Sequence, residues 1–460
     1  MLINISQFGS IRKAEIDTAK PFTVFCGPNN TGKTYVSYLL YAIFSQDFAC
    51  DSKFIGQIVN MVLEKGEFQM KREYLDQYLA EMETMISQSI GSIFGISDRD
   101  VSNFKNFKLK LSLGDEEADK IIQDTPLMWR FQTIDFKFEA KKETHSDKIT
   151  VAIELRSPDG ERMVRQLMPL FVCKILKSWV TNGVNGARML TVERNSIYTF
   201  KTELSITRNE LVDSLLSSDG KGLNLERILG KGSRRYPLAI RDSLRIANDL
   251  VNIQKTNSLF YEAACQIEQE MLGGAITISK DGDVIFTPDI GDKEAGLPIQ
   301  ISSSIVKTLS SLVIYLKFIA KPGDLLIMDE PEMNLHPDNQ ILLARIFSAL
   351  QNKGLRVLIS THSDYIVREI NNLVMAYELK KLQADGDKAL FPYNDSILLN
   401  PDYLQVYYFD YKKIENINMV ESILVDKNRY GFNVSSIDNV INQQNDITES
   451  LYDTLSFRYQ

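Results

Sequence analysis

The chain has 460 residues, of which 44% are hydrophobic and 24% are charged, and this usage is close to that of ordinary globular domains. It excludes a disordered or fibrous protein, and the length corresponds to about three average domains or one domain enlarged by insertions. The net charge of −8 excludes a surface that is basic throughout, so any contact with DNA or RNA must be a local patch.

Cysteine usage and hydropathy predict an intracellular protein. The 4 cysteines include no CxxC pair, which excludes a disulfide framework and a cysteine-based zinc site. Lysines interrupt the apolar runs before they reach the ~20 residues of a membrane helix. The start, MLINISQFGSIRK, lacks the apolar block of a signal peptide. We therefore expect a cytoplasmic protein with no membrane partner.

Residues 1–45 predict three strands, a loop and a helix, in that order. The segments LINIS, IRKAEID and FTVFC have the alternation or the apolar run of strands, and Tyr35 to Phe44 contains no Gly or Pro. Residues 46–125 are polar and predict mostly helix. Residues 129–157 then alternate, as FQTIDFKFEA and KITVAIELRS, which predicts an antiparallel hairpin.

The second half of the chain predicts a parallel α/β sheet. A helix near 162–181 and a strand from Arg188 to Val192 come first, and residues 202–272 are again expected to be helical. The segment AITISKDGDVIFTP predicts a second hairpin, because Asp281-Gly282 favours a tight turn. From Ser302 to Met375 helices and strands alternate, as they do in parallel sheets.

These elements divide the chain into a core with insertions. The core is expected at 1–45 and 273–377, with strands contributed by 126–200. The other parts are helical insertions at 46–125 and 201–272 and a mixed C-terminal α/β extension at 378–460, which carries the strand-like LQVYYFD. The predicted fold class is α/β, with a mixed sheet, antiparallel hairpins and helical insertions.

The segment GPNNTGKT at residues 27–34 matches G-x-x-x-x-G-K-[ST] between an apolar strand and a helix. Its glycines let backbone N–H groups turn toward phosphate, and the helix N-terminus adds a favourable dipole. We expect Lys33 to reach the β- and γ-phosphates of a nucleotide and the Thr34 hydroxyl to bind Mg²⁺. The residues expected to contact the nucleotide are Asn29, Asn30, Thr31, Gly32, Lys33 and Thr34.

The segment DLLIMDEP ends an apolar strand with Asp329 and Glu330. Such a strand ends at the carboxyl edge of an open α/β sheet, where ligands collect. Asp329 is suited to binding Mg²⁺ through a water, and Glu330 is suited to polarising the water that attacks a γ-phosphate. An apolar strand followed by Asp-Glu is common on its own, and the phosphate loop is what favours a catalytic role here.

A third strand, VLIS, is followed by Thr361, His362 and Ser363. A lone histidine after a strand is usually an ordinary surface or core residue. Because the other two motifs are present, we favour a contact between His362 and the γ-phosphate. His336, in the segment NLHP, is instead expected to shape the turn after the carboxylates.

The phosphate loop, the segment LLIMDEPEMNLHP and the segment STHS together resemble the ATP-binding-cassette (ABC) class of ATPases. Within it they are similar to the non-transporter branch of OLD-family and SMC-type proteins, the AAA-15- and AAA-21-like ATPases, where DEPE-x-x-LHP replaces the transporter form. The resemblance covers roughly 1–45, 273–375 and the segment MLTVERNS. It implies an ABC-type P-loop core, the cofactors ATP and Mg²⁺, and catalysis by Glu330 and His362.

The resemblance also implies a signature segment that contacts a nucleotide bound to another subunit. The matching residues are Ser302, Ser303 and Ser304, followed by Ile305 where the family usually has a glycine. Serines that open a helix are good phosphate donors, and a plain helix cap is the alternative. We therefore expect a homo-oligomer, a dimer or larger, that forms through its ATP sites.

Two features have no clear assignment. Glu193, Arg194 and Asn195 occupy the place of the family's Gln-loop without a glutamine, and such a turn after a strand is often merely a turn. Basic residues cluster at Lys105–Lys110, Lys231–Arg235 and Lys380-Lys381. Such runs are usually solvated faces, although the concentrated cluster at 231–235 could contact nucleic acid or an acidic partner.

Several functions compete for these motifs. The favoured one is an ATPase that assembles around ATP and controls a separate effector, and the resemblance implies a nuclease or toxin effector in bacterial anti-phage defence. An OLD-type ATP-dependent nuclease is disfavoured because the strand LQVYYFDYKK carries no DxD. An SMC-type tether is disfavoured because the insertions lack sustained heptads. The ATPase subunit of a DNA repair or recombination complex stays an alternative.

Overall fold

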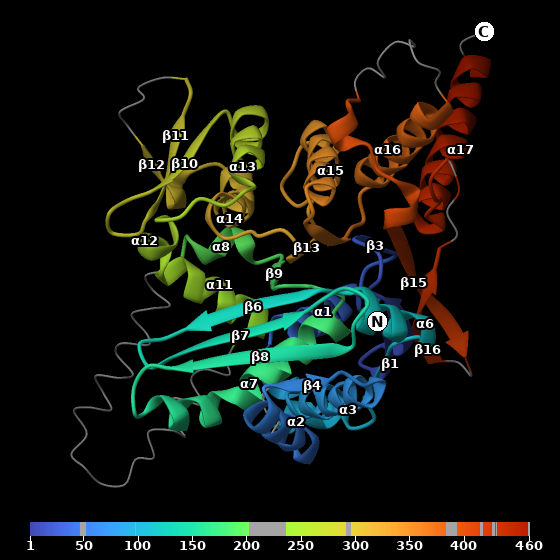
Figure 1. The fold of residues 1–460 in the computed structure, drawn as a ribbon. Helices are drawn as coiled ribbons and strands as arrows, with labels where there is room; N and C mark the ends of the chain where they lie inside the picture. The colour runs from blue at the N-terminus through green and yellow to red at the C-terminus, as the bar shows by residue number, and fades with distance from the viewer. Residues whose placement is uncertain are drawn as a thin grey trace.

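In the computed structural model, a large sheet separates two layers of helices (Figure 1). The fold is mixed α/β with antiparallel hairpins, as the sequence predicted. Among the described residues, no helix combines the length and apolarity needed to cross a membrane. The structure describes residues 1–46, 52–96, 98–201, 236–290, 296–382, 393–414, 417–425, 428 and 430–458.

The central sheet has nine strands in the order β5-β1-β2-β16-β15-β3-β14-β13-β9. Strands β9, β13, β14, β3 and β15 run parallel to one another, whereas β1 pairs antiparallel with both β2 and β5. The strands are β1 (Leu2–Phe8), β2 (Ile11–Asp17), β3 (Phe22–Cys26), β5 (Lys108–Ser112), β9 (Ala187–Leu190), β13 (Leu325–Asp329), β14 (Arg356–Ser360), β15 (Leu404–Ile414) and β16 (Ile417–Leu424).

The parallel strands are buried on both faces. In β13, Leu325 and Ile327 belong to one apolar core and Leu326 and Met328 belong to the other, because successive side chains of a strand point to opposite faces. Two-sided burial explains why these strands are continuous apolar runs in the sequence. Burial on both faces also fixes the register of these strands, and the register determines where their ends lie in the sheet.

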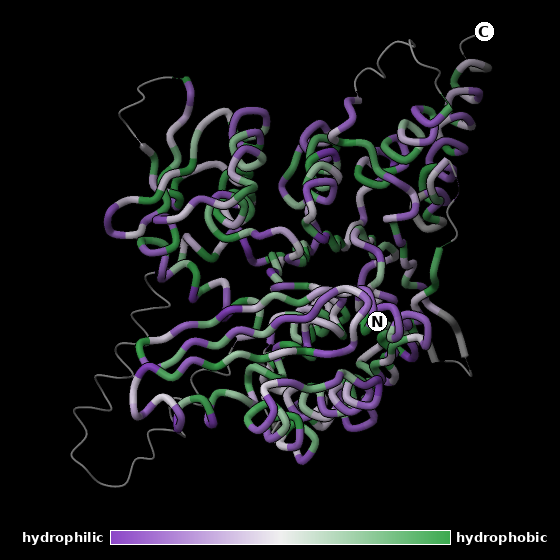
Figure 2. Tube along the Cα trace, viewed as in Figure 1, coloured by the Kyte–Doolittle hydropathy of each residue, from purple (hydrophilic) through white to green (hydrophobic). Residues whose placement is uncertain are grey.

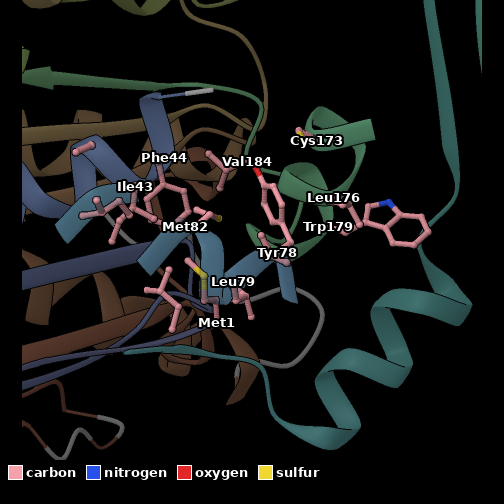
Figure 3. Packing of buried hydrophobic residues seen from close by; sticks show 14 of the residues in the cluster. Met1, Ile43, Phe44, Tyr78, Leu79, Met82, Cys173, Leu176, Trp179 and Val184 are labelled. Carbon is pink, nitrogen blue, oxygen red and sulfur yellow. The ribbon is translucent and has the colours of Figure 1, made fainter. Parts of the chain in front are cut away.

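Helices α1 (Lys33–Ser45), α2 (Lys53–Lys65), α3 (Arg72–Gln88) and α7 (Gly160–Val180) fill one side of the central sheet. Figure 3 shows Phe44 of α1, Met82 of α3 and Trp179 of α7 within this core. All three are buried, and a fully buried phenylalanine or methionine contributes about 1.5–3 kcal/mol. This packing anchors α1 and therefore the loop that precedes it.

A second sheet, in the order β4-β8-β7-β6, packs on α7. The hairpin predicted for 129–157 is a three-stranded antiparallel unit, to which β4 is added. Polar and apolar residues alternate along it (Figure 2), and the rings of Phe138 and Phe171 lie 4.8 Å apart. Its strands are β4 (Glu67–Gln69), β6 (Leu127–Gln132), β7 (Phe136–Lys142) and β8 (Lys148–Leu155).

The described residues of the segment 46–125 are mostly helical, and they also include two strands. These strands are β4 and β5, and β5 is an edge strand of the central sheet. The alternation in KLKLS buries Leu109 and Leu111 between exposed lysines, so this insertion contributes to the core. Its short helices are α4 (Ile90–Phe94), α5 (Asp98–Val101), the 3-10 helix η1 (Ser102–Phe104) and α6 (Asp115–Asp124).

The other side of the sheet is covered by α13 (Tyr261–Ile267), α14 (Ser304–Phe318), α15 (Pro337–Asn352) and α16 (Asp364–Leu382). The hairpin predicted at Asp281-Gly282 is formed by β10 (Gly274–Ile278) and β11 (Val284–Pro288). Residues 202–235, with the basic cluster Lys231–Arg235, lie outside the described residues. The remaining elements between β9 and α14 in the chain are α8 (Arg194–Ile197), α11 (Leu238–Asn248), α12 (Leu250–Ile253), the π-helix η2 (Glu268–Leu272), β12 (Leu297–Pro298) and the 3-10 helix η3 (Ile299–Ile301).

The tail 378–460 supplies two strands of the central sheet. β15 pairs in parallel with β3, and β16 pairs in parallel with β2. The mixed tail, with the strand predicted at LQVYYFD, is therefore continuous with the central sheet. The rings of Phe409 in β15 and Phe25 in β3 lie 5.1 Å apart. The tail also includes the 3-10 helices η4 (Asp395–Ile397) and η5 (Pro401–Tyr403) and the helix α17 (Ser435–Arg458).

We expect Gly27→Ala to destabilise the protein. Gly27 has φ +131°, and a Cβ at this position would overlap the carbonyl oxygen of Phe409, so the substitution adds strain and a clash inside the sheet. The free energy of unfolding, measured by urea denaturation, should fall by at least ~1–3 kcal/mol. In the control Gly56→Ala on α2, the added Cβ meets nothing within 4 Å, and stability should rise by about 0.5–1 kcal/mol. Equal effects would contradict this account.

Candidate functional site

The loops that follow β3, β13 and β14 meet at one edge of the central sheet. The three parallel strands end in register, because Asp329 pairs with Ser360 and Ser360 pairs with Phe25. Open α/β folds bind ligands at this carboxyl edge. The structure thus brings together the three motifs that the sequence singled out.

The loop between β3 and α1 has the backbone of an anion-binding cradle. Gly27, Asn30 and Gly32 have positive φ values of 131°, 61° and 83°, and Gly32 is the N-cap of the 13-residue helix α1. Backbone of this kind turns successive N–H groups toward one point, and the helix N-terminus adds partial positive charge. Thr31 is buried, and its hydroxyl donates to the carbonyl of Pro28 at 2.8 Å.

Lys33 places a buried ammonium inside this cradle. Its Nζ donates to the carbonyls of Gly27 at 2.9 Å and Pro28 at 2.7 Å. Burial lowers the pKa of Lys33 to about 8, and the Asp329 carboxylate opposes this shift. A cation disfavoured by its own burial gains from an anion placed beside it. Lys33 is therefore suited to hold a phosphate.

Asp329 and Thr34 form a pair of oxygen ligands. Asp329 is buried, its Oδ2 accepts a hydrogen bond from the Thr34 hydroxyl at 2.9 Å, and its Oδ1 accepts one from the Ser360 hydroxyl. Burial raises the pKa of Asp329, and these two hydroxyls oppose the rise. Mg²⁺ in nucleotide sites takes few protein oxygens and completes its shell with phosphates and waters. This donor set fits Mg²⁺.

Glu330 follows Asp329 in a strained backbone conformation. Its φ is 46°, in the left-handed region that non-glycine residues rarely adopt. Its backbone N–H donates to the Ser360 carbonyl at 2.9 Å, and its side chain is 40% exposed at the rim of the site. Burial, followed by the charge of Asp329, raises its pKa. A carboxylate with a raised pKa is a better proton acceptor.

His362 lies beside Glu330, with 3.9 Å between its Nε2 and the Glu330 Oε1. Burial, together with the charge of Lys33, lowers the pKa of His362 to about 4. The imidazole is therefore neutral at pH 7 and able to donate a single hydrogen bond. His336 is separate from this group: it is exposed and is the N-cap of α15, where its Nδ1 accepts from the Asp338 N–H at 3.4 Å.

Glu332 is a site residue that the sequence did not single out. Its half-buried carboxylate accepts hydrogen bonds from the His362 N–H at 2.6 Å and the Thr361 hydroxyl at 3.0 Å. It therefore ties the turn after β13 to the turn after β14. The available signal was its place in DEPE, two residues after Glu330, but an exposed turn carboxylate would look the same in the sequence.

Two more residues reach the site from distant segments. The Tyr411 hydroxyl, on the tail strand β15, donates to the carbonyl of the exposed loop residue Asn29 at 2.9 Å. The guanidinium of Arg194, which follows β9, donates to the carbonyls of Asp329 and Glu330. The sequence placed Arg194 at a turn without assigning its function, and nothing in the sequence indicated Tyr411.

Ser302, Ser303 and Ser304 lie at the N-terminal end of the 15-residue helix α14. Ser303 is its N-cap, and Ser303 and Ser304 are exposed. Ser302 is buried and its hydroxyl donates to the Pro298 carbonyl at 3.1 Å. Their contact with a nucleotide on another subunit stays a prediction.

Two of the basic clusters are visible, and each forms surface ion pairs. Lys110 Nζ lies 3.4 Å from Glu83, and Lys380 Nζ lies 2.6 Å from Asp395. Exposed pairs of this kind contribute little energy. A nucleic-acid contact at such clusters also stays a prediction.

The model of the family described as AAA ATPase domain matches residues 1–182 and 240–367. Two curated relatives are both named cell division ATP-binding protein FtsE. They come from Streptococcus pneumoniae serotype 2 (strain D39 / NCTC 7466) and Streptococcus pneumoniae (strain ATCC BAA-255 / R6). Each is 33% identical over 70 residues, which is 15% of this chain. The chain spans 30% of the length of these relatives.

Two solved head domains align with most of this chain. One is the Smc head domain with an extended coiled coil from Pyrococcus furiosus, bound to the C-terminal domain of ScpA. It has 12% identity, a TM-score of 0.34 and coverage of 97% of this chain and 98% of that chain. The other is the SMC head domain from Thermotoga maritima, with 10% identity, a TM-score of 0.28 and coverage of 92% and 98%. Similarity at this level does not extend to what the chain binds.

Proposed function

Because the chain belongs to the AAA ATPase domain family, we propose that it binds ATP with Mg²⁺ at the edge of β3, β13 and β14 and hydrolyses it. One observation carries the proposal. The Thr34 hydroxyl lies 2.9 Å from the Asp329 carboxylate, and the charge of the buried Lys33 ammonium acts on the same carboxylate. This combination supplies a cation for the phosphates and two oxygen ligands for a metal.

In this proposal each residue of the site has a separate task. The loop N–H groups, the N-terminus of α1 and Lys33 hold the phosphates. Thr34 and Asp329 would hold Mg²⁺, which would neutralise part of the phosphate charge. Glu330 takes a proton from the attacking water. The neutral His362 donates a hydrogen bond to the γ-phosphate.

We further propose that the chain assembles as a homo-oligomer around ATP. Ser303 and Ser304 are exposed at the N-terminus of α14, where backbone N–H groups and hydroxyls favour an anion. A nucleotide held by another copy would supply that anion. Assembly would then depend on the nucleotide state, because ATP and ADP differ in the γ-phosphate that the second copy contacts.

The chain, in this proposal, controls a separate effector, a nuclease or toxin, in cytoplasmic anti-phage defence. The resemblance of its motifs to ATPases of such systems supports this function by analogy. The placement of the tail supports it as well. The described part of the tail adds β15 and β16 to the central sheet and so belongs to the sheet that carries the ATP motifs.

Glu330→Gln should bind ATP and hydrolyse it about 10²–10⁴-fold more slowly, because the amide keeps the shape of the side chain and cannot accept the proton. Phosphate release measures hydrolysis and calorimetry measures binding. Lys33→Ala should lose binding itself, while Glu378→Gln, at an exposed pair with Lys381, should change neither. Near-normal turnover of Glu330→Gln would give Glu330 a structural role.

ATP should raise the mass of the Glu330→Gln protein in light scattering, because this variant retains the γ-phosphate that joins the copies. Adding Ser303→Glu and Ser304→Glu should prevent the increase by placing negative charge beside the phosphates. Ser87→Glu, on the exposed face of α3, is the matched control and should not. A monomeric mass with and without ATP would refute assembly.

The purified protein should leave nucleic acid intact, because its effector is a separate molecule. Plasmid DNA, linear DNA and tRNA are incubated with the protein, ATP and Mg²⁺ or Mn²⁺, and the products are separated on a gel. Cleavage that persists in the repurified Lys33→Ala variant would show a nuclease site in this chain and would favour the OLD-type alternative.

A further inference from the structure

The backbone of Glu330 needs an external support. Its φ of 46° costs free energy in a non-glycine residue, and such strain persists only where the surroundings impose it. One support is the hydrogen bond from the Glu330 N–H to the Ser360 carbonyl at 2.9 Å. That bond fixes the N-terminal side of the residue. On the other side, the Glu330 carbonyl accepts from the Met333 N–H at 3.2 Å within the same turn and from one group outside the turn.

Arg194 holds the carbonyl side. Its Nη1 donates to the Asp329 carbonyl at 2.6 Å, and its Nη2 donates to the Glu330 carbonyl at 2.7 Å. Two N–H groups of one planar fork thus bind two consecutive carbonyls, which fixes the peptide between them in orientation as well as position. A lysine ammonium has no such planar fork.

The arginine is itself fixed in place. Nη1 also donates to the Thr191 carbonyl at 3.0 Å, and the Arg194 carbonyl accepts from the Ser311 hydroxyl of α14 at 3.4 Å. Arg194 is only 1% exposed. It therefore has no surface to offer a nucleotide, and any effect on the reaction must pass through the residues that it holds.

The acceptors of Arg194 are what connect it with the site. Arg356, outside the site, also donates to main-chain carbonyls, those of residues 18–20. Two of the carbonyls that Arg194 binds belong to Asp329 and Glu330. Its charge still faces the carboxylates of Asp329, Glu332 and Glu330, which offset part of the cost of burying it.

We propose that Arg194 is a positioning residue for ATP hydrolysis: its guanidinium holds the left-handed turn from which the Glu330 carboxylate faces the attacking water. Arg194 fills the place where the sequence lacks a Gln-loop glutamine. The inference rests on the proposed function, because it presumes that Glu330 acts as the base.

The test separates ATP binding from turnover in four proteins: wild type, Arg194→Gln, Arg194→Lys and Arg188→Gln. Arg188 is the matched control, because it is a buried arginine on the preceding strand β9 and bonds Ser243 at 3.1 Å, away from the turn. The dissociation constant for ATP with Mg²⁺, measured by calorimetry, should stay within about threefold of wild type in both Arg194 variants.

Turnover should respond differently. In Arg194→Gln, kcat should fall about 10²-fold, the loss that a displacement near 1 Å of a catalytic group causes. Arg194→Lys should recover part of this loss, since one ammonium can still reach a carbonyl. Arg188→Gln should lower the midpoint of thermal unfolding and leave kcat unchanged. An unchanged kcat in both Arg194 variants, or a kcat loss matched by lost ATP affinity, would overturn the proposal.

A double-mutant cycle tests whether Arg194 acts through Glu330. When Glu330 is already Gln, adding Arg194→Gln should change kcat by less than about threefold, because residues that act as one unit are non-additive. A full second loss would overturn the proposal. If Arg194→Gln does not fold, Arg194→Lys carries both comparisons. Absence of turnover in wild type would instead refute the proposed function.

Discussion

A hydrogen bond from the Thr34 hydroxyl to the Asp329 carboxylate joins groups that are 295 positions apart in the chain. This hydrogen bond requires β3 and β13 to end at the same edge of the sheet. That in turn requires β14, which lies between them, to pair in register with both strands. The strands are buried on both faces, so a slip by one residue would send each side chain into the wrong core. The two apolar cores therefore set the geometry of the polar site.

The sequence was sufficient for features with a local signature. The phosphate loop, the strand that ends in Asp329 and the hairpin at Asp281-Gly282 each depend on residues close in the chain, and all three are present. β5 was missed because a strand of five residues inside a helical segment gives a short pattern. Arg194 was missed for another reason: its partners are carbonyl groups, which every residue has, so its bonds leave no trace in residue types.

The site concentrates charges that the interior disfavours. Burial lowers the pKa values of Lys33 and Arg194 and raises those of Asp329 and Glu332. Each charge is kept by fixed partners: carbonyls for the cations, hydroxyls and an N–H for the carboxylates. Burying ions in this way is rarely a source of stability. What it provides is a set of dipoles already oriented before a ligand arrives.

The place of the tail in the sheet also sets the order in which the protein can be completed on the ribosome. β15 lies directly beside β3, and its Tyr411 bonds Asn29 from 382 positions away. The loop at residues 27–34 is therefore translated long before the strand that contacts it. Until β15 emerges, that flank of β3 is an open strand edge, which can pair with other chains. The strand order therefore leaves this edge of β3 exposed while the residues between β3 and β15 are synthesised.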